Sequence, residues 1–217
     1  MPFNTTAKHV MLDALDESVT QITHVAVWTL TDPGTGTNAT GTEATGGSPA
    51  YARQAVTWGT PSGGTVSNTG ALTFDVPAGT YGFFTLWNAS SGNTNNFRGY
   101  LCFAGATPKK GFGTVDSADV TADTINSNGH GLVNTDRVIA FNVVGETIPT
   151  GITEGAAYFV VGAATDTFQI STTSGGAAVN LTGQGEVYFE KVVPEVFAGQ
   201  GQITAAIAAL VLDASAI

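Results

Sequence analysis

The sequence predicts a mainly β protein, a β-sandwich with one N-terminal helix that is interrupted by a second small β domain. Glycine is abundant (28 of 217 residues) and only 11% of residues are charged, a composition that suits short strands and tight turns. Short alternating runs of apolar and polar residues recur between these turns. The motif Gly-Gln-Gly also occurs twice, at 183–185 and 199–201, each time before a strand-like run. Two closing strands are more than one small domain needs.

The first predicted element is a helix that begins at Asn4 or Thr5, both good N-cap residues, and ends near Ser18. Apolar side chains recur along this segment with the spacing of one buried helical face. They are Ala7, Val10, Met11, Ala14 and Leu15.

Five strands are expected next, in the order 22–30, 51–58, 71–76, 80–88 and 97–104. Residues 33–49 separate the first two and read as a long exposed loop of Gly, Thr, Asn, Ala and Ser. Strands this short and evenly spaced are typical of a sandwich. The closing segment 203–212 is rich in alanine, which favours a helix, but its place after Gly-Gln-Gly favours a strand. We prefer the strand.

The inner domain is expected to contain strands at 120–126, 136–143, 157–162, 166–171 and 185–191. Residues 105–113 and 192–196 are interpreted as its two linkers, because insertions are tolerated at exposed loops whose ends lie close together. The predicted domains are therefore a discontinuous docking domain, 1–112 with 192–217, and an inserted, projecting domain, 113–191.

Charge and cysteine content exclude several classes of function. The net charge is −10, so the chain gains nothing from counterion release at a phosphate backbone, and we expect no nucleic-acid partner. Much of the acidity falls between Thr114 and Lys191, which fits a solvated projecting module or simple solubility. The single cysteine, Cys102, permits no intrachain disulfide and no thiolate metal cluster. No apolar stretch reaches the roughly 20 residues of a membrane span, so no membrane partner is expected.

Candidate catalytic and metal-binding residues are few. The three histidines, His9, His24 and His130, accompany no Gly-x-Ser-x-Gly motif, and His130 is expected to shape a turn between two glycines. The acidic residues Asp116, Asp119 and Asp123 do not have the spacing of a calcium loop, and we interpret them as a solvated linker. The sequence therefore predicts no enzyme, no metal and no cofactor.

Aromatic residues and arginines of the outer domain form the candidate assembly interface. Arginine and the large aromatic residues are enriched at interfaces, although tryptophans on strands also pack in cores or form sugar-stacking platforms. The candidates are Trp28, Tyr51, Arg53, Trp58, Trp87 and Arg98.

The outer domain resembles a family of small virion proteins of tailed bacteriophages that is common in phages of actinobacteria. The resemblance rests on a frame of motifs along residues 1–104 and 192–217. They are Asn4-Thr-Thr-Ala-Lys8, Thr23-His-Val-Ala-Val-Trp-Thr29, Asp32-Pro-Gly34, Gly46-Gly-Ser-Pro-Ala-Tyr-Ala-Arg53, Ala55-Val-Thr-Trp58, Phe74-Asp-Val-Pro-Ala-Gly79, Leu86-Trp-Asn88 and Phe197-Ala-Gly-Gln-Gly201.

The inner stretch resembles a small β module that recurs in phage structural and tail proteins. The matching segments are Gly129-His-Gly-Leu-Val133, Asp136-Arg137-Val138, Tyr158-Phe-Val-Val161 and Thr167-Phe-Gln-Ile170.

The resemblance implies a capsid decoration (minor capsid) protein that binds the virion surface noncovalently and stabilises the particle after assembly in the host cytoplasm. Its expected partners are the major capsid protein or other virion proteins, and further copies of itself, with a trimer as one option. The alternative is a minor tail or tail-fibre protein whose inner module binds host-surface glycans through Tyr158 and Phe159. A glycan-degrading enzyme, the third reading, requires a pair of carboxylates in a cleft, and none can be singled out.

Overall fold

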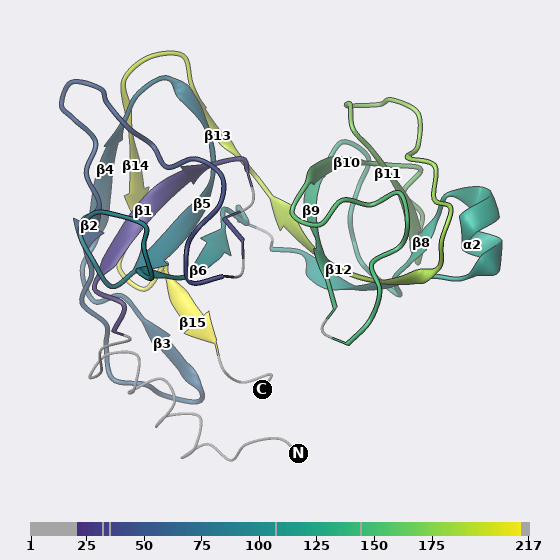
Figure 1. Ribbon diagram of the computed structural model, residues 1–217, viewed down its shortest axis with the longest axis horizontal. Coiled ribbons are helices and arrows are strands. Elements are labelled where there is room, and N and C mark those ends of the chain that lie inside the picture. The colour runs from purple at the N-terminus through teal and green to yellow at the C-terminus, as the bar shows by residue number, and fades with distance from the viewer. Residues whose placement is uncertain (1–20, 32, 35, 107, 144, 214–217) are drawn as a thin grey trace. The chain divides into compact units, whose positions relative to one another are not determined.

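The computed structural model describes residues 21–213 except 32, 35, 107 and 144. The chain divides into two compact units, each described by itself below (Figure 1). The outer unit comprises Met1–Thr29, Pro33–Leu101 and Glu195–Ile217; the barrel unit comprises Cys102–Pro194 together with Leu30–Asp32. The predicted mainly β class is confirmed, because the described residues form strands and only one short helix. The predicted N-terminal helix, 5–18, lies outside the described residues.

The outer unit is built on a five-stranded antiparallel sheet with the order β13-β5-β1-β2, in which β6 also pairs with β5. Its strands are β1 His24–Thr29, β2 Gln54–Ala55, β5 Gly79–Trp87, β6 Phe97–Cys102 and β13 Glu195–Phe197. The long β5 is the centre of this sheet, and Val25 of β1 lies opposite Leu86. Val25 and Leu86 are buried, as β-branched and leucine side chains on a central strand pair should be.

Two separate two-stranded ribbons complete the outer unit. One pairs β4 Leu72–Val76 with β14 Gly201–Ala205, and the other pairs β3 Thr65–Ser67 with β15 Val211–Asp213. The predicted segment 203–212 is therefore strand at both ends, but a turn divides it. The buried Asn68 holds this turn, because its amide donates to the Ala206 carbonyl and its Oδ1 accepts from the N–H of Leu210, both at 2.9 Å.

Most predicted strands of the outer unit are confirmed, but the one at 51–58 is wrong in extent. Only Gln54–Ala55 pairs with β1, and Trp58 forms a single bridge to Asn68. The sequence also missed β3, which lies in a stretch that reads as a Gly-rich turn. A two-residue or three-residue strand has too short an alternation to stand out from a loop.

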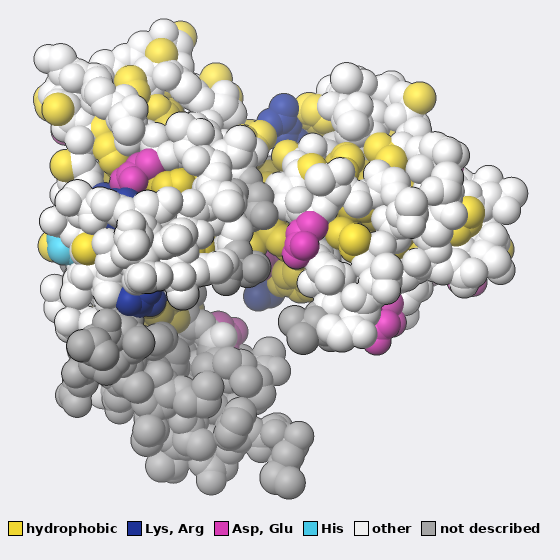
Figure 2. All heavy atoms as spheres, in the orientation of Figure 1, with side chains coloured by type: hydrophobic (Ala, Val, Ile, Leu, Met, Phe, Trp, Pro, Cys, Tyr) yellow, Lys and Arg dark blue, Asp and Glu magenta, His cyan; other side chains and the backbone are white. Residues whose placement is uncertain are grey.

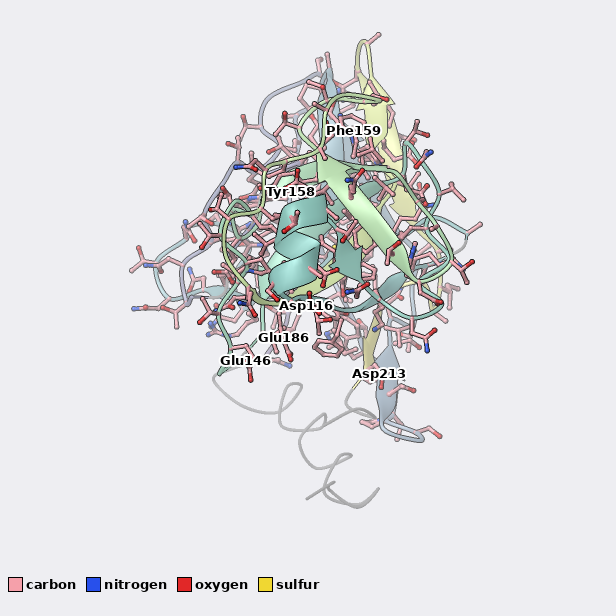
Figure 3. All side chains as sticks on the ribbon, turned by 90° about the vertical axis from the view of Figure 1, so that its right-hand side faces the viewer. Asp116, Glu146, Tyr158, Phe159, Glu186 and Asp213 are labelled. Carbon is pink, nitrogen blue, oxygen red and sulfur yellow. The ribbon has the colours of Figure 1, made fainter. Side chains whose placement is uncertain are left out.

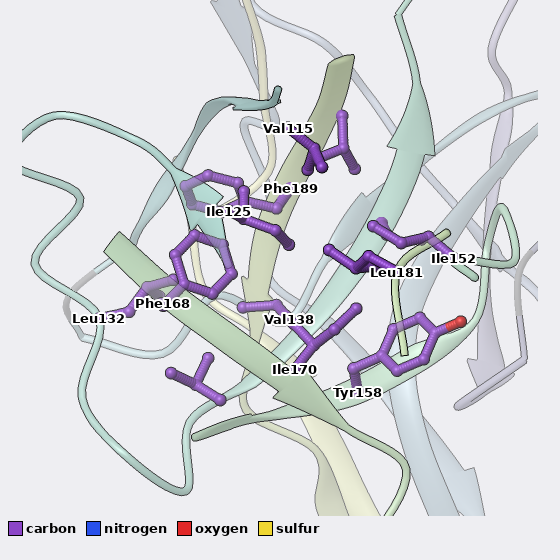
Figure 4. Close-up of a cluster of buried hydrophobic side chains, with 13 residues drawn as sticks. Val115, Ile125, Leu132, Val138, Ile152, Tyr158, Phe168, Ile170, Leu181 and Phe189 are labelled. Carbon is purple, nitrogen blue, oxygen red and sulfur yellow. The ribbon is translucent and has the colours of Figure 1, made fainter. Parts of the chain in front are cut away.

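The barrel unit is a closed six-stranded barrel with the order β10-β11-β8-β7-β12-β9. Its strands are β7 Lys110–Val115, β8 Ile125–Asn126, β9 Arg137–Asn142, β10 Ala157–Val161, β11 Thr167–Ser171 and β12 Gly185–Val192. Alternate side chains point inward, as the two-residue period of a strand requires, and form one aromatic and aliphatic core (Figure 4). Phe168 and Phe189 meet edge to face near its centre, with ring centroids 5.1 Å apart.

Two predictions for the inner domain are corrected. Residues 120–126 are not one strand: helix α2, Ser117–Ala122, occupies the first part and only Ile125–Asn126 is extended. Residues 105–113 are not wholly a linker, because β7 begins at Lys110 and pairs with β12 along six residues. The two ends of the barrel unit lie side by side, since the Val193 N–H donates to the Phe103 carbonyl at 2.6 Å.

Candidate functional site

The three tryptophans of the predicted interface lie inside the outer unit. Trp28, Trp58 and Trp87 are all buried. Each indole N–H also has an internal acceptor at 2.8 Å: the Thr40 carbonyl for Trp28, the Ile22 carbonyl for Trp58 and the Thr85 hydroxyl for Trp87. Of the three alternatives for these residues (interface packing, core packing and a sugar-stacking platform), core packing therefore describes their positions, because all three side chains are buried within the unit.

Arg53 and Glu43 form a nearly buried ion pair on top of Trp87. The Arg53 Nε and Nη2 donate to the two carboxylate oxygens of Glu43, each at 2.8 Å, and the guanidinium carbon lies 3.6 Å from the centre of the Trp87 ring. The remaining donors reach the carbonyls of Ala89 and Gly92. Because the Arg53 side chain is only 4% exposed, this fork is an internal clamp that holds two loops to the sheet.

Tyr51 extends the same cluster, which we call the arginine cluster (Glu43, Tyr51, Arg53 and Trp87). Its hydroxyl donates to Glu43 Oε1 at 3.2 Å and accepts from the Val27 N–H at 2.8 Å. Burial, and then the Glu43 carboxylate, raise the pKa of the Tyr51 hydroxyl well above its usual value. The Tyr51 hydroxyl therefore stays protonated, and it both accepts and donates a hydrogen bond. Such a group supports the fold and is poorly suited to proton transfer.

Arg98 lies beside a shallow surface depression of the outer unit. Its Nη1 donates to the carbonyls of Asn95 and Phe97, at 2.9 Å and 2.8 Å. The depression is lined by Gly34, Gly36, Thr37, Asn95, Phe97, Arg98, Gly99 and Tyr100. Of the predicted interface residues, Arg98 thus lies at a concave part of the surface, whereas Tyr51, Arg53 and Trp87 meet in the arginine cluster.

The two glycan candidates of the barrel occupy different environments, although they are adjacent in sequence. Tyr158 belongs to the barrel core, and its hydroxyl accepts the Thr153 N–H at 2.8 Å. A core side chain cannot contact a glycan, so the structure leaves Phe159 as the surface candidate of the pair (Figure 3). The Phe159 ring is itself covered on one face by Arg137, whose guanidinium carbon lies 4.4 Å from the ring centre.

The interpretation of the acidic residues as a solvated linker is wrong, because they cap helix α2. Asp116 accepts from the N–H groups of Ala118 and Asp119, and Asp119 accepts in return from the Asp116 N–H, the reciprocal arrangement of a capping box. The buried Asp119 also accepts from the Asn126 amide at 2.6 Å. Asp123 accepts from the Leu181 N–H at 2.8 Å. The backbone N–H groups of Asp119 and Ala118 lower the pKa of Asp116.

His130 shapes a turn between two glycines of positive φ, as predicted: Gly129 has φ +61° and Gly131 has φ +62°. Its Nδ1 accepts the Leu132 N–H at 3.0 Å, which leaves the proton on Nε2 to donate to the Thr167 carbonyl at 3.2 Å. The ring packs against Phe168 with centroids 5.0 Å apart. Nδ1 thus holds the loop's own backbone and Nε2 ties the loop to β11, and neither nitrogen is hydrogen-bonded to a carboxylate that could orient the imidazole for catalysis.

The sequence reasoning missed an aromatic row on the outside of the barrel. Phe112 of β7 lies opposite Tyr188 of β12, which lies opposite Phe141 of β9. The Phe112 and Tyr188 rings are 5.2 Å apart, the Tyr188 hydroxyl donates to Glu190 at 2.8 Å, and the Phe112 side chain is 63% exposed. The signal that could have found it is the alternation Lys-Gly-Phe-Gly-Thr-Val at 110–115, which marks an amphipathic strand.

No protein-family model matches the chain, and no curated protein matches it. Within the described residues, no group of three or more histidine, cysteine or carboxylate side chains is placed to hold a metal ion. The described part of the chain also contains no helix long and apolar enough to cross a membrane.

Proposed function

We propose that this chain is a bacteriophage virion structural protein that decorates the capsid. In this proposal the outer unit is the β-sandwich that docks on the major capsid protein, and the barrel unit projects from it. The observation that carries the proposal is the way one domain interrupts the other. The chain leaves the outer unit at Leu101 and returns at Glu195, and the two connecting segments pair through the Val193 N–H and the Phe103 carbonyl.

An insertion with paired ends adds a module without disturbing the domain that carries it. In a decoration protein this division would let one part keep a fixed shape complementary to the particle while the other faces the medium. The outer unit keeps its polar donors and acceptors internally satisfied in the arginine cluster. Docking would then remove few charged groups from water. Figure 2 shows only a few Lys, Arg, Asp and Glu side chains on the face in view.

Purified particles of the phage that encodes the chain provide the test. Quantitative mass spectrometry of intact particles measures the copy number of the chain relative to the major capsid protein, and a density map of the particle locates it. Decoration requires a copy number of the same order as that of the major capsid protein and density on the shell. Complete absence of the chain from purified particles would contradict a virion role of any kind.

The alternative is a tail protein whose barrel unit binds host-surface glycans, and the exposed Phe112 at the end of the aromatic row favours it. Apolar C–H faces of sugars stack on aromatic rings, and the Phe112 ring is exposed beside the hydrogen-bonded Tyr188–Glu190 pair. A glycan array with the full chain tests this, with Phe112→Ala and Phe159→Ala as the loss variants and Val196→Ala, an exposed apolar residue of the outer unit, as the control. Binding that requires Phe112, together with a low copy number at the tail, selects this alternative over decoration.

A further inference from the structure

The loop between β8 and β9 contains the one Asn-Gly pair in the sequence, Asn128-Gly129. Both residues are exposed and form a turn directly after Ser127. A side chain placed on Gly129 would meet no atom within 4 Å, so solvent reaches the backbone on this side. The peptide nitrogen that follows Asn128 is therefore sterically open, unlike the nitrogen that follows an asparagine before a branched residue.

This arrangement suits one spontaneous reaction. The Gly129 backbone nitrogen loses its proton to base and attacks the side-chain Cγ of Asn128, forming a C–N bond and a five-membered succinimide. The C–N bond of the side-chain amide breaks, and the amide nitrogen leaves as ammonia with protons from water. Water then opens the ring at either carbonyl, giving an aspartate or an isoaspartate at position 128. No oxidant, metal or enzyme is required.

The structure also contains a restraint on this reaction. The Gly129 N–H donates to the Asp166 Oδ1 at 2.9 Å, and the Ser127 N–H donates to the Asp166 carbonyl at 2.8 Å. The reaction must remove the proton that the Asp166 carboxylate binds, and it must place negative charge on a nitrogen beside that carboxylate. Both effects raise the barrier, because a hydrogen bond to a charged acceptor is stronger than a neutral one.

We propose that Asn128 is a succinimide-forming modification site and that the carboxylate of Asp166 slows its conversion. The inference rests on the loop and not on the virion role. The modification would act on this loop alone and would weaken its hydrogen bonds. The product carries a new carboxylate near Asp166, and the isoaspartate form adds a methylene to the backbone. Both weaken the bond from the Gly129 N–H and so loosen the loop that His130 ties to Thr167.

The test is peptide mapping of the full chain after incubation at mildly alkaline pH, with isoaspartate measured at each asparagine. Asn128 is expected to convert well before Asn142 and Asn180, which are exposed but precede Val143 and Leu181. Asn180 is a matched internal control, because the N–H that follows it also donates to a carboxylate, that of Asp123. Replacing Asn128 by Gln should abolish the modification, since the ring would need six members.

Asp166→Ala is expected to accelerate conversion of Asn128 about tenfold or more, the factor that corresponds to one charge-assisted hydrogen bond. Asp166→Asn keeps an acceptor without the charge and should give an intermediate rate. Circular dichroism checks that each variant retains its strands, and Asp166→Asn carries the test if Asp166→Ala does not fold. The proposal is overturned if Asn128 is converted more slowly than Asn180. It is also overturned if Asn128 is converted no faster in folded Asp166 variants than in the parent protein.

Discussion

The outer unit and the barrel unit are both made of strands, but different interactions complete them. In the barrel, every strand has two neighbours, so the ladder satisfies the backbone groups and the core fills the centre. In the outer unit, the described strands form an open sheet and two ribbons, and long loops connect them. Asn93 shows how such loops are held, since its amide exchanges two hydrogen bonds, of 2.7 and 2.8 Å, with the backbone of Ala39.

This difference indicates which substitutions should destabilise each unit most. Buried backbone groups without a strand partner need a side chain to satisfy them, so single polar residues matter most in the outer unit. In the closed barrel the strands satisfy one another, and side chains serve only the connecting loops, so the barrel is most sensitive to loss of core volume. The chain offers a reporter for the comparison. All three tryptophans belong to the outer unit, so tryptophan fluorescence follows its unfolding, while amide exchange of the barrel strands follows that of the barrel unit.

The largest expected effect is that of Phe168→Ala in the barrel. Phe168 is fully buried between Phe189 and His130, and the cavity left by its ring should lower the free energy of unfolding of the barrel by about 4 kcal/mol. Amide exchange of β9 and β12 should accelerate while the tryptophan transition stays in place. Phe112→Ala, on the exposed face, is the matched control and should change the stability by less than about 0.5 kcal/mol. Equal losses in the two variants would contradict the comparison.

Arg53→Ala should produce the complementary result in the outer unit. The substitution leaves Tyr51 as the remaining partner of the Glu43 carboxylate within the cluster, and it uncovers the Trp87 ring. We expect it to lower the free energy of unfolding of the outer unit by about 3 kcal/mol. The tryptophan transition in urea should move to lower denaturant, and barrel exchange should not change. Arg53→Lys keeps the charge but cannot form two parallel bonds, so it should recover only part of the loss. Full recovery with lysine would show that charge alone matters.

A pair of tyrosines makes the comparison sharper, because each hydroxyl accepts one backbone N–H at 2.8 Å. Tyr51 accepts from Val27 in the outer unit, and Tyr158 accepts from Thr153 in the barrel. Tyr51→Phe also removes the hydrogen bond to Glu43, so it should lower the free energy of unfolding by about 2 kcal/mol, against about 1 kcal/mol for Tyr158→Phe. Thermal unfolding of the two variants measures the difference. A larger loss at Tyr158 would mean that the cluster is not the main support of the outer unit.

The smallest expected effect is the response of helix α2 to acid. The fold lowers the pKa of Asp116 below its ordinary value of 3.8, because the N–H groups of Asp119 and Ala118 stabilise the carboxylate. The stabilisation is therefore present above pH 3.8 and is lost as the pH falls through the lower, folded pKa. The protection of the amides in 117–122, measured against the exchange rate of an unstructured chain at the same pH, should decrease in that range. Asp116→Asn should show a flatter response over the same range, and an unchanged response would contradict the cap assignment.

Local patterns in the sequence were sufficient for several features. Alternation at β4 and β10 predicts strands because it reflects one buried and one less buried face. Gly129 and Gly131 predict the turn at His130 because only glycine adopts positive φ without strain. Prediction from local patterns failed at helix α2, because a six-residue helix has too few turns to give a periodic signal. The two residues of its capping box, Asp116 and Asp119, also have the composition of an ordinary acidic loop.

The candidate site shows most clearly what could not be predicted from the sequence. The sequence suggested Arg53, Tyr51 and Trp87 as candidate interface residues, but only the tertiary structure brings them together with Glu43 inside one unit. It also decides that Tyr158 faces inward and Phe159 outward, since the strand period fixes that neighbours alternate but not which of them meets the core.

The sequence by itself determined that this protein is mainly β, acidic, low in charge and punctuated by glycine turns. The tertiary structure alone decided that the inner strands close into a barrel. Strand β7 shows the physical reason. Its inward positions include Gly111 and Gly113, which make the segment resemble a linker, yet Phe189 and Ile125 fill the space beside those glycines. A side chain supplied from another strand leaves no mark in the local sequence, so the pairing that closes the barrel could not be predicted from it.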